Sequence, residues 1–149
     1  MTIKKLLIAN RGEIASRIIS SSHDMGISCV AIYTEADKDT LYVREADQAF
    51  KLSDSYLNSK EILDIALKSN SDAIHPGYGF LSENAAFANQ VKKLNIKWVG
   101  PSSNAIKKMG DKLTAKEIAI IANVPTLKMN SCLLYTSDSS DDVLGVVGG

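Results

Sequence analysis

Residues 75–84 read His-Pro-Gly-Tyr-Gly-Phe-Leu-Ser-Glu-Asn, and this stretch joins an apolar strand to a helix through a turn. Pro76 ends the hydrogen-bond ladder of the strand, and the two glycines allow backbone angles that other residues rarely adopt. Ser82 can cap a helix that begins near Glu83. In an open parallel sheet, such a turn lies at the carboxyl edge of the strands, where ligands bind. The alternative is a tight connection whose glycines serve geometry only.

Strand and helix signals alternate along the chain on both sides of this turn, which favours crossover connections and a parallel sheet. Apolar runs predict strands at residues 5–9, 28–33, 48–52, 73–75 and 96–99. Periodicity and capping residues predict helices at residues 13–25, from Asn58 with Glu61 onward, and at 83–94, 103–109 and 111–122. Residues 34–46 carry only weak helical signals. We therefore predict an α/β, Rossmann-like domain of three layers built on a parallel sheet.

Composition excludes several classes of protein. The 17 basic and 17 acidic side chains give a formal net charge of zero, so we expect neither nucleic acid nor a membrane surface as a partner. No secretory leader or stretch of about 20 apolar residues is found, which predicts a cytoplasmic location. Cys29 and Cys132 stand far apart and no histidine cluster accompanies them, so the sequence supports neither a disulfide framework nor a zinc site. Cys29 is expected to be a small buried residue.

Four further blocks accompany residues 75–84. They read Ile-Ala-Asn-Arg-Gly-Glu-Ile-Ala at 8–15, Ser-Tyr-Leu-Asn at 55–58, Val-Gly-Pro-Ser at 99–102 and Met-Gly-Asp-Lys at 109–112. Together, and in this order, the blocks resemble the amino-terminal domain of biotin carboxylase, the ATP-grasp component of biotin-dependent carboxylases. The resemblance runs from about residue 4 to about residue 126, which is most of the chain.

The resemblance implies an enzyme that uses ATP, bicarbonate and Mg²⁺ or Mn²⁺ to carboxylate biotin on a carrier protein. The implied partners are a biotin carboxyl carrier protein or domain, a second copy of the full-length protein and a carboxyltransferase subunit. The final acceptor could be acetyl-, propionyl- or methylcrotonyl-CoA, or pyruvate. Metal ligands and catalytic residues would belong to lobes outside this chain, which alone is expected to be inactive. Another ATP-grasp ligase, or a non-catalytic nucleotide-binding module, remains an alternative.

The resemblance also implies site residues. Tyr78, Gly79 and Glu83 match positions near biotin, and Lys112 matches a lysine that contacts ATP. The residue types fit these roles, because tyrosine offers an apolar wall with a polar tip and glycine lets a ligand approach the backbone. Asp111 can cap a helix whose first turn carries Lys112, and a helix start favours phosphate. We expect the turn and Lys112 to converge on one pocket.

Three segments are expected. Residues 1–110 form the Rossmann-like domain, residues 111–130 begin an ATP-grasp region, and residues 131–149 form a tail that is non-native or disordered. The tail contains no lysine or arginine. Its residues 132–137, Cys-Leu-Leu-Tyr-Thr-Ser, resemble the conceptual translation of a transposon adaptor used in sequencing libraries. A natural disordered terminus is the alternative.

The adaptor interpretation makes a prediction about the gene. The codons for residues 132–137 should spell TGTCTCTTATACACATCT or a near copy of it. The nucleotide sequence from which this chain was translated checks the prediction, and source DNA sequenced again without this adaptor should lack the stretch. Unrelated synonymous codons would contradict it.

Overall fold

The computed structural model describes residues 2–126 of the chain. Its contacts divide the protein into two units, residues 1–115 and residues 116–149, and the division falls within a helix. The predicted tail, residues 131–149, lies outside the described residues. The first unit contains the whole sheet.

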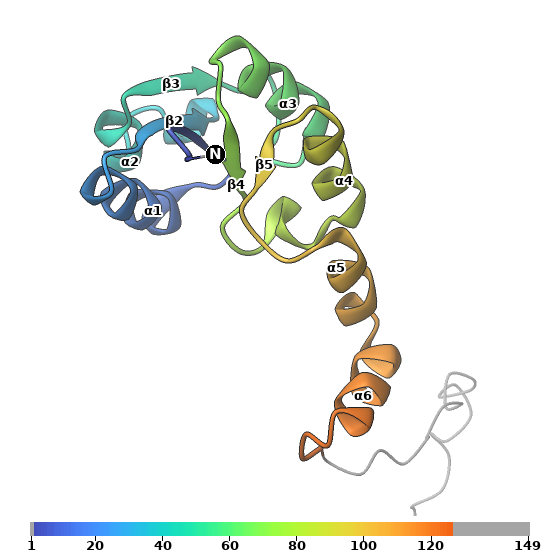
Figure 1. The fold of residues 1–149 in the computed structure, drawn as a ribbon. Coiled ribbons are helices and arrows are strands. Elements are labelled where there is room, and N and C mark those ends of the chain that lie inside the picture. The colour runs from blue at the N-terminus through green and yellow to red at the C-terminus, as the bar shows by residue number, and fades with distance from the viewer. Residues whose placement is uncertain (1, 127–149) are drawn as a thin grey trace, which may run out of the picture. The chain divides into compact units, whose positions relative to one another are not determined.

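Five parallel strands form one sheet in the order β3-β2-β1-β4-β5. In Figure 1, β3 and β5 lie on opposite sides of β4. They are β1 (Lys5–Ile8), β2 (Ser28–Tyr33), β3 (Gln48–Lys51), β4 (Ala73–His75) and β5 (Lys97–Trp98). The order reverses between β1 and β4, because the chain crosses from the β3 edge back to the centre of the sheet. This is the doubly wound arrangement, so the predicted α/β fold with a parallel sheet is confirmed.

Helices lie on both faces of the sheet (Figure 1). They are α1 (Gly12–Asp24), α2 (Leu41–Glu45), α3 (Ser59–Lys68), α4 (Ala85–Lys93), α5 (Ser103–Gly110) and α6 (Lys112–Ile121), with 3₁₀ turns η1 (Glu35–Asp37) and η2 (Phe80–Glu83). Apolar side chains of α1 and α2 pack in one core cluster, and apolar side chains of α3 and α4 pack in another. The three predicted layers are therefore present.

Alternation along β1 explains how one strand serves two cores. Leu6 and Ile8 pack in the cluster with α1 and α2, whereas Leu7 packs in the cluster with α3 and α4. All three side chains are buried. Successive side chains of a strand point to opposite faces, so a central parallel strand is apolar throughout. This is why the sequence signal for β1 is a continuous apolar run.

Two predicted helix caps are confirmed and one is wrong. The Asn58 side chain accepts a hydrogen bond from the Glu61 backbone N–H at 3.2 Å. Asp111 Oδ1 likewise accepts from the Thr114 backbone N–H at 2.7 Å. Ser82 caps no α-helix, because it lies inside η2 and its N–H bonds to the carbonyl of a turn glycine, Gly79. Asn84 caps α4 instead, which begins at Ala85 rather than near residue 83.

The weakly predicted segment 34–46 contains the turn η1 and the short helix α2. Tyr42 of α2 is almost fully buried and packs in the core cluster with α1. Tertiary packing therefore decides the structure here, because the local signals are too weak to do so. None of the helices within residues 2–126 is both long enough and apolar enough to cross a membrane.

Candidate functional site

The candidate site lies at the carboxyl edge of the sheet, where the chain leaves β1, β2 and β4. We call residues 75–79 the glycine turn. Beside it lie Asn10 and Arg11 after β1, Asp37 after β2, and Tyr56 before α3. Hydrogen bonds connect these segments in two groups, one around Asn10 and one around Asp37.

Asn10 holds the glycine turn against the end of β1. Its side chain is fully buried, and its Nδ2 donates to the carbonyl oxygens of Pro76 at 2.8 Å and Tyr78 at 3.0 Å. Its Oδ1 accepts from the Arg11 backbone N–H at 2.9 Å. The amide thus uses both of its donor hydrogens and its acceptor. A buried amide satisfied in this way fixes the backbone of the turn relative to the central strand.

The turn glycines are required for different reasons. Gly77 has a φ of +65°, and a Cβ added there would lie 2.5 Å from Asn10 Nδ2 and 2.9 Å from Ile14 Cγ2. Gly79 has φ 68° and ψ −166°, a region that essentially only glycine occupies, but a Cβ there would meet nothing within 4 Å. Space and backbone both demand glycine at position 77, whereas at position 79 the backbone alone demands it.

His75 also has a structural role in the turn. Its Nδ1 accepts a hydrogen bond from the Gly77 backbone N–H at 3.0 Å. Burial lowers the pKa of the His75 imidazole from its ordinary value of 6.5. The neutral ring is therefore the form that the fold favours, and protonation at Nδ1 would break the bond to the turn. His75 is therefore a structural part of the turn.

Asp37 is the centre of the second group. It is 4% exposed, and Arg11 binds it with two groups, Nε at 2.7 Å from Oδ2 and a terminal nitrogen against Oδ1. Tyr56 Oη donates to Oδ2 at 2.5 Å and lies 2.9 Å from Tyr42 Oη. The Arg11 hydrogen bond, assisted by that of Tyr56, holds the pKa of the Asp37 carboxyl below its ordinary value. Burial raises the pKa of the Tyr42 hydroxyl, so that group stays protonated.

Aromatic contacts join the two groups. The Tyr56 ring lies 5.5 Å from the ring of Phe80, which directly follows the glycine turn, measured between centroids. The Arg11 guanidinium carbon lies 5.8 Å from the Tyr56 centroid, within the range of a cation–π contact. Arg11 therefore finds both a carboxylate and an aromatic face inside this domain. The carboxyl edge is a connected unit rather than a set of separate loops.

The structure brings together three of the four predicted site residues. Tyr78 and Gly79 lie in the glycine turn, Glu83 ends η2, and all three are exposed. The Tyr78 side chain is 71% exposed, so its ring is available to a ligand. Lys112 is the exposed first residue of α6. Within residues 2–126, the structure shows no hydrogen bond or ion pair that joins Lys112 to the other three.

Sequence reasoning missed Asp37 and Tyr56 as parts of the site, and it gave Asn10 no individual role. One signal could have identified Asn10, because a polar residue that directly ends an apolar strand must find hydrogen-bond partners when buried. Asp37 and Tyr56 carry no such local signal. They lie 19 residues apart in the sequence, and only the fold brings them together.

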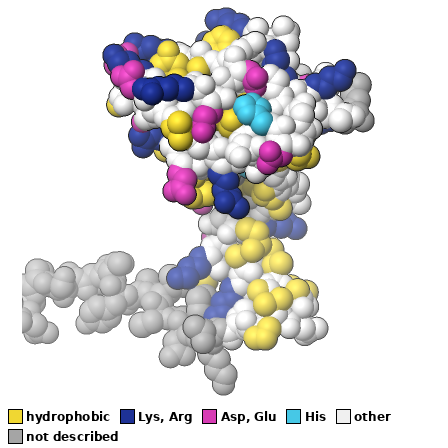
Figure 2. All heavy atoms as spheres, turned by 90° about the vertical axis from the view of Figure 1, so that its left-hand side faces the viewer, with side chains coloured by type: hydrophobic (Ala, Val, Ile, Leu, Met, Phe, Trp, Pro, Cys, Tyr) yellow, Lys and Arg dark blue, Asp and Glu magenta, His cyan; other side chains and the backbone are white. Residues whose placement is uncertain are grey.

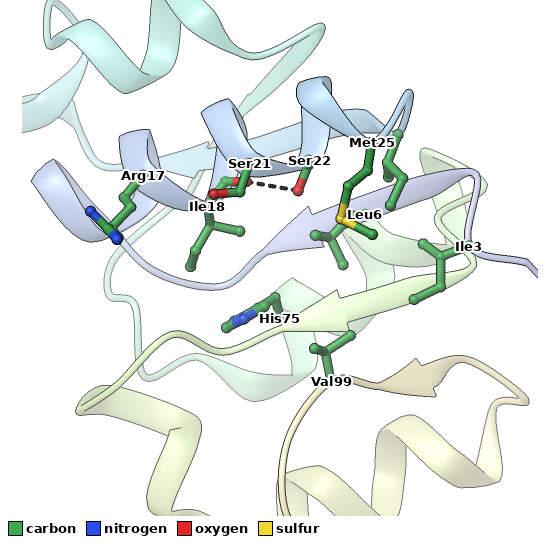
Figure 3. Close-up of a pocket in the computed structure, with 10 residues that line it drawn as sticks. Ile3, Leu6, Arg17, Ile18, Ser21, Ser22, Met25, His75 and Val99 are labelled. Carbon is green, nitrogen blue, oxygen red and sulfur yellow. Dashed lines mark hydrogen bonds between the residues drawn. The ribbon is translucent and has the colours of Figure 1, made fainter.

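An apolar hollow of about 340 Å³ lies beside α1, and Figure 3 shows its lining. His75 and Val99 point into it from the β4 and β5 side, opposite Ile18 and Met25 of the α1 segment. The ring of His75 thus contacts the glycine turn through Nδ1 and also lines this hollow.

On the face drawn in Figure 2, acidic and basic side chains are intermixed, and neither sign covers a large area.

The confined position of Gly77 predicts that replacing it by alanine lowers the free energy of unfolding more than the same change at Gly26. Gly26 also has a positive φ, of +70°, but a Cβ there meets nothing within 4 Å. Gly26→Ala should therefore lower the free energy of unfolding by about 1 kcal/mol, through backbone strain alone. Gly77→Ala should lower it by about 1–3 kcal/mol more, because the added methyl group overpacks against Asn10. Urea unfolding of both variants measures the difference. Equal losses would show that Asn10 does not confine the turn.

The Asp37 group predicts how stability depends on pH. Its folded pKa lies below the ordinary value of 3.8, so its contribution is present above that value and is lost as pH falls through the lowered pKa. Asp37→Asn should cost about 1.5–3 kcal/mol at pH 7 and flatten the acid limb of the stability profile. Urea midpoints between pH 7 and about pH 2 test this. Asp39→Asn, at an exposed neighbour, serves as control, and a profile unchanged by Asp37→Asn would contradict the assignment.

Comparison with known proteins supports one family. The family model described as biotin carboxylase, N-terminal domain, matches residues 2–106. Biotin carboxylase 1 of Bacillus subtilis is 47% identical over 98% of this chain and 34% of the relative, an alignment that reaches into residues beyond 130. A pyruvate carboxylase subunit from Methanothermobacter thermautotrophicus is 45% identical over 83% of this chain and 26% of the relative.

Solved structures agree with these relatives. The biotin carboxylase domain dimer of Hydrogenobacter thermophilus 2-oxoglutarate carboxylase, in complex with MgADP, ADP and bicarbonate, matches with a TM-score of 0.81 and 44% identity. That match covers 85% of this chain and 29% of the other. The biotin carboxylase subunit of a pyruvate carboxylase matches with a TM-score of 0.82 and 42% identity, over 87% of this chain and 30% of the other.

The chain spans about a third or less of the length of the relatives and solved structures compared with it. The family model covers most of the chain, and the parallel sheet predicted from the sequence pattern is the one observed. By sequence and by fold, this chain belongs to the biotin carboxylase N-terminal domain family.

Proposed function

We propose that this chain is the amino-terminal part of a biotin carboxylase, an enzyme that uses ATP and bicarbonate to carboxylate biotin on a carrier protein. The observation that carries the proposal is the 44% identity to a biotin carboxylase domain solved with MgADP and bicarbonate. Relatives named as biotin carboxylases or carboxylase subunits, at 40–49% identity, support it.

The glycine turn is the part of the chain that would face biotin. Tyr78 is exposed, and its ring can give an apolar wall to the bicyclic ring system of biotin. Gly79 leaves open space where a side chain would stand, so a ligand can approach the backbone closely. Asn10 fixes the turn before any ligand binds, which reduces the ordering cost of binding.

Lys112 would contact ATP. Asp111 accepts from the Thr114 N–H and so fixes the start of α6, which leaves the Lys112 ammonium exposed in the first turn. The backbone N–H groups of a helix start favour a phosphate, and a lysine adds a compact positive charge. The turn, with biotin, and Lys112, with ATP, would face one pocket when the remaining lobes of the enzyme are present.

A divalent metal would spread the charge that develops during phosphoryl transfer from ATP to bicarbonate. Within residues 2–126, the glycine turn contains no group of three or more metal-ligating side chains. The Mg²⁺ or Mn²⁺ would therefore be held by other lobes, and this chain would orient biotin and ATP. We infer that the chain alone does not turn over ATP.

The proposed partners are the carrier protein, a second copy of the full-length enzyme and a carboxyltransferase subunit. One matched solved structure is named as a domain dimer, which supports the second copy. The acceptor of the carboxyl group stays open, because the relatives include subunits of methylcrotonoyl-CoA carboxylase and of pyruvate carboxylase. The cytoplasmic location also stays a prediction, since relatives include chloroplastic and mitochondrial proteins.

A chimera tests the proposal. Residues 1–126 of this chain replace the matching part of biotin carboxylase 1 of Bacillus subtilis, and biotin-dependent ADP release is measured with the isolated chain as a blank. The chimera should be active and the isolated chain inactive. Lys112→Gln in the chimera should lower kcat/KM for ATP about 10- to 100-fold, the value of a lost hydrogen bond from a charged group.

Lys116→Gln is the matched control, because Lys116 lies one turn further along α6 and has no assigned contact. It should leave kcat/KM for ATP unchanged. A folded chimera without biotin-dependent turnover would contradict the proposed function. Equal effects of the two lysine substitutions would instead contradict only the role of Lys112.

A further inference from the structure

We propose that His23, Cys29 and Asp47 bind a zinc ion. His23 lies in the last turn of α1, Cys29 lies in the first part of β2, and Asp47 directly precedes β3. All three positions belong to the amino edge of the parallel sheet, whereas the glycine turn belongs to the carboxyl edge. The proposed zinc site is therefore separate from the biotin and ATP site.

The distances suit one metal ion. One ligand atom from each residue (a ring nitrogen, the thiol sulfur and a carboxylate oxygen) lies within 4.8 Å of each of the others. His23 Nε2 is 3.0 Å from Asp47 Oδ2. Zinc bonds of about 2.0–2.3 Å at tetrahedral angles place ligand atoms about 3.3–3.8 Å apart. Side-chain shifts of about 1 Å or less would therefore complete the coordination.

The backbone holds two of the ligands in position. Asp47 Oδ2 accepts the Cys29 backbone N–H at 2.7 Å, which fixes the carboxylate beside the start of β2. A carboxylate has two oxygens, so one can keep this bond while the other binds the metal, and metal-binding carboxylates are commonly hydrogen-bonded in this way. The Cys29 Sγ lies 3.7 Å from the Ile27 carbonyl oxygen, a weak contact that a metal bond can replace.

The site can be reached from solvent. A shallow hollow is lined by His23, Gly26, Ile27, Ser28 and Asp47. The side chains of His23 and Asp47 are 41% and 46% exposed, whereas Cys29 is fully buried. Cys29 would thus be the inner ligand, and the open side would leave a fourth position for water. On binding, the Cys29 thiol releases its proton to solvent and the thiolate bonds the metal.

The donor set selects the class of metal. One nitrogen, one sulfur and one oxygen fit borderline-soft zinc, while Mg²⁺ and Ca²⁺ need oxygen ligands. The three ligands come from one helix and two strand starts, so the ion would cross-link the end of α1 to neighbouring strands. The sequence carries no zinc signal, because the usual sign is clustered Cys and His residues, and these three are dispersed along residues 23–47.

The full chain, reduced and free of metal, is titrated with Co²⁺ and then with Zn²⁺. A Co²⁺–thiolate bond gives a charge-transfer band in the near ultraviolet, and zinc should remove it at one equivalent. Cys29→Ser should abolish the band. Cys132→Ser, which removes the other cysteine of the chain, should retain it. Zinc should also raise the Tm of the unmodified chain and not that of Cys29→Ser.

His23→Gln is a second, independent test of the zinc site. The His23 side chain is exposed, so this substitution should leave the fold intact. It should weaken Zn²⁺ binding at least about 10-fold in the Co²⁺ competition, because one of three protein ligands is lost. A band that persists in Cys29→Ser, an unmodified chain without any band, or equal affinity in His23→Gln would each overturn the proposal. These readouts do not involve ATP or biotin, so their failure leaves the proposed function untouched.

Discussion

The buried amide of Asn10 is the contact on which the candidate site depends. It reaches across from the end of β1 to two carbonyl oxygens of a turn 66 and 68 residues further along the chain. Without these bonds, the amide would be buried without partners and the turn carbonyls would lose their donors. Each unsatisfied group would lower the free energy of unfolding. The absence of a side chain at Gly77 gives the amide its room. The Asn10 amide and the absence of a methyl group at Gly77 therefore determine the position of Tyr78.

The Asp37 group supports the same edge in a different way. Arg11 follows Asn10 directly, so the backbone that positions the amide also positions the guanidinium. Through Asp37 and Tyr56, the ends of β1 and β2 are connected to the segment before α3, and Phe80 packs on the Tyr56 ring. Removing one partner would leave the buried Asp37 carboxylate without its compensating charge, so the edge favours the arrangement in which Arg11 reaches it. The edge is thus organised before any ligand arrives.

Features determined by local sequence could be predicted, and features determined by long-range contacts could not. The apolar runs located all five strands, and the caps at Asn58 and Asp111 were predictable because a cap needs only residues three apart. The predicted cap at Ser82 was wrong because the residues before α4 form η2, and a short 3₁₀ turn has no periodicity that the sequence could reveal. Asp37 has partners 19 and 26 residues away, which no local pattern reveals.

The last described helix, α6, has a consequence for handling the protein. It contains no buried residue, and Ile120 and Ile121 are 55% and 81% exposed. A helix of this length gains little from its own hydrogen bonds in water, so local opening costs it little free energy. Proteases cut such segments first. Limited proteolysis of the purified chain is thus expected to trim α6 early and to spare the sheet with its glycine turn, which would give a shorter and more homogeneous domain for crystallisation.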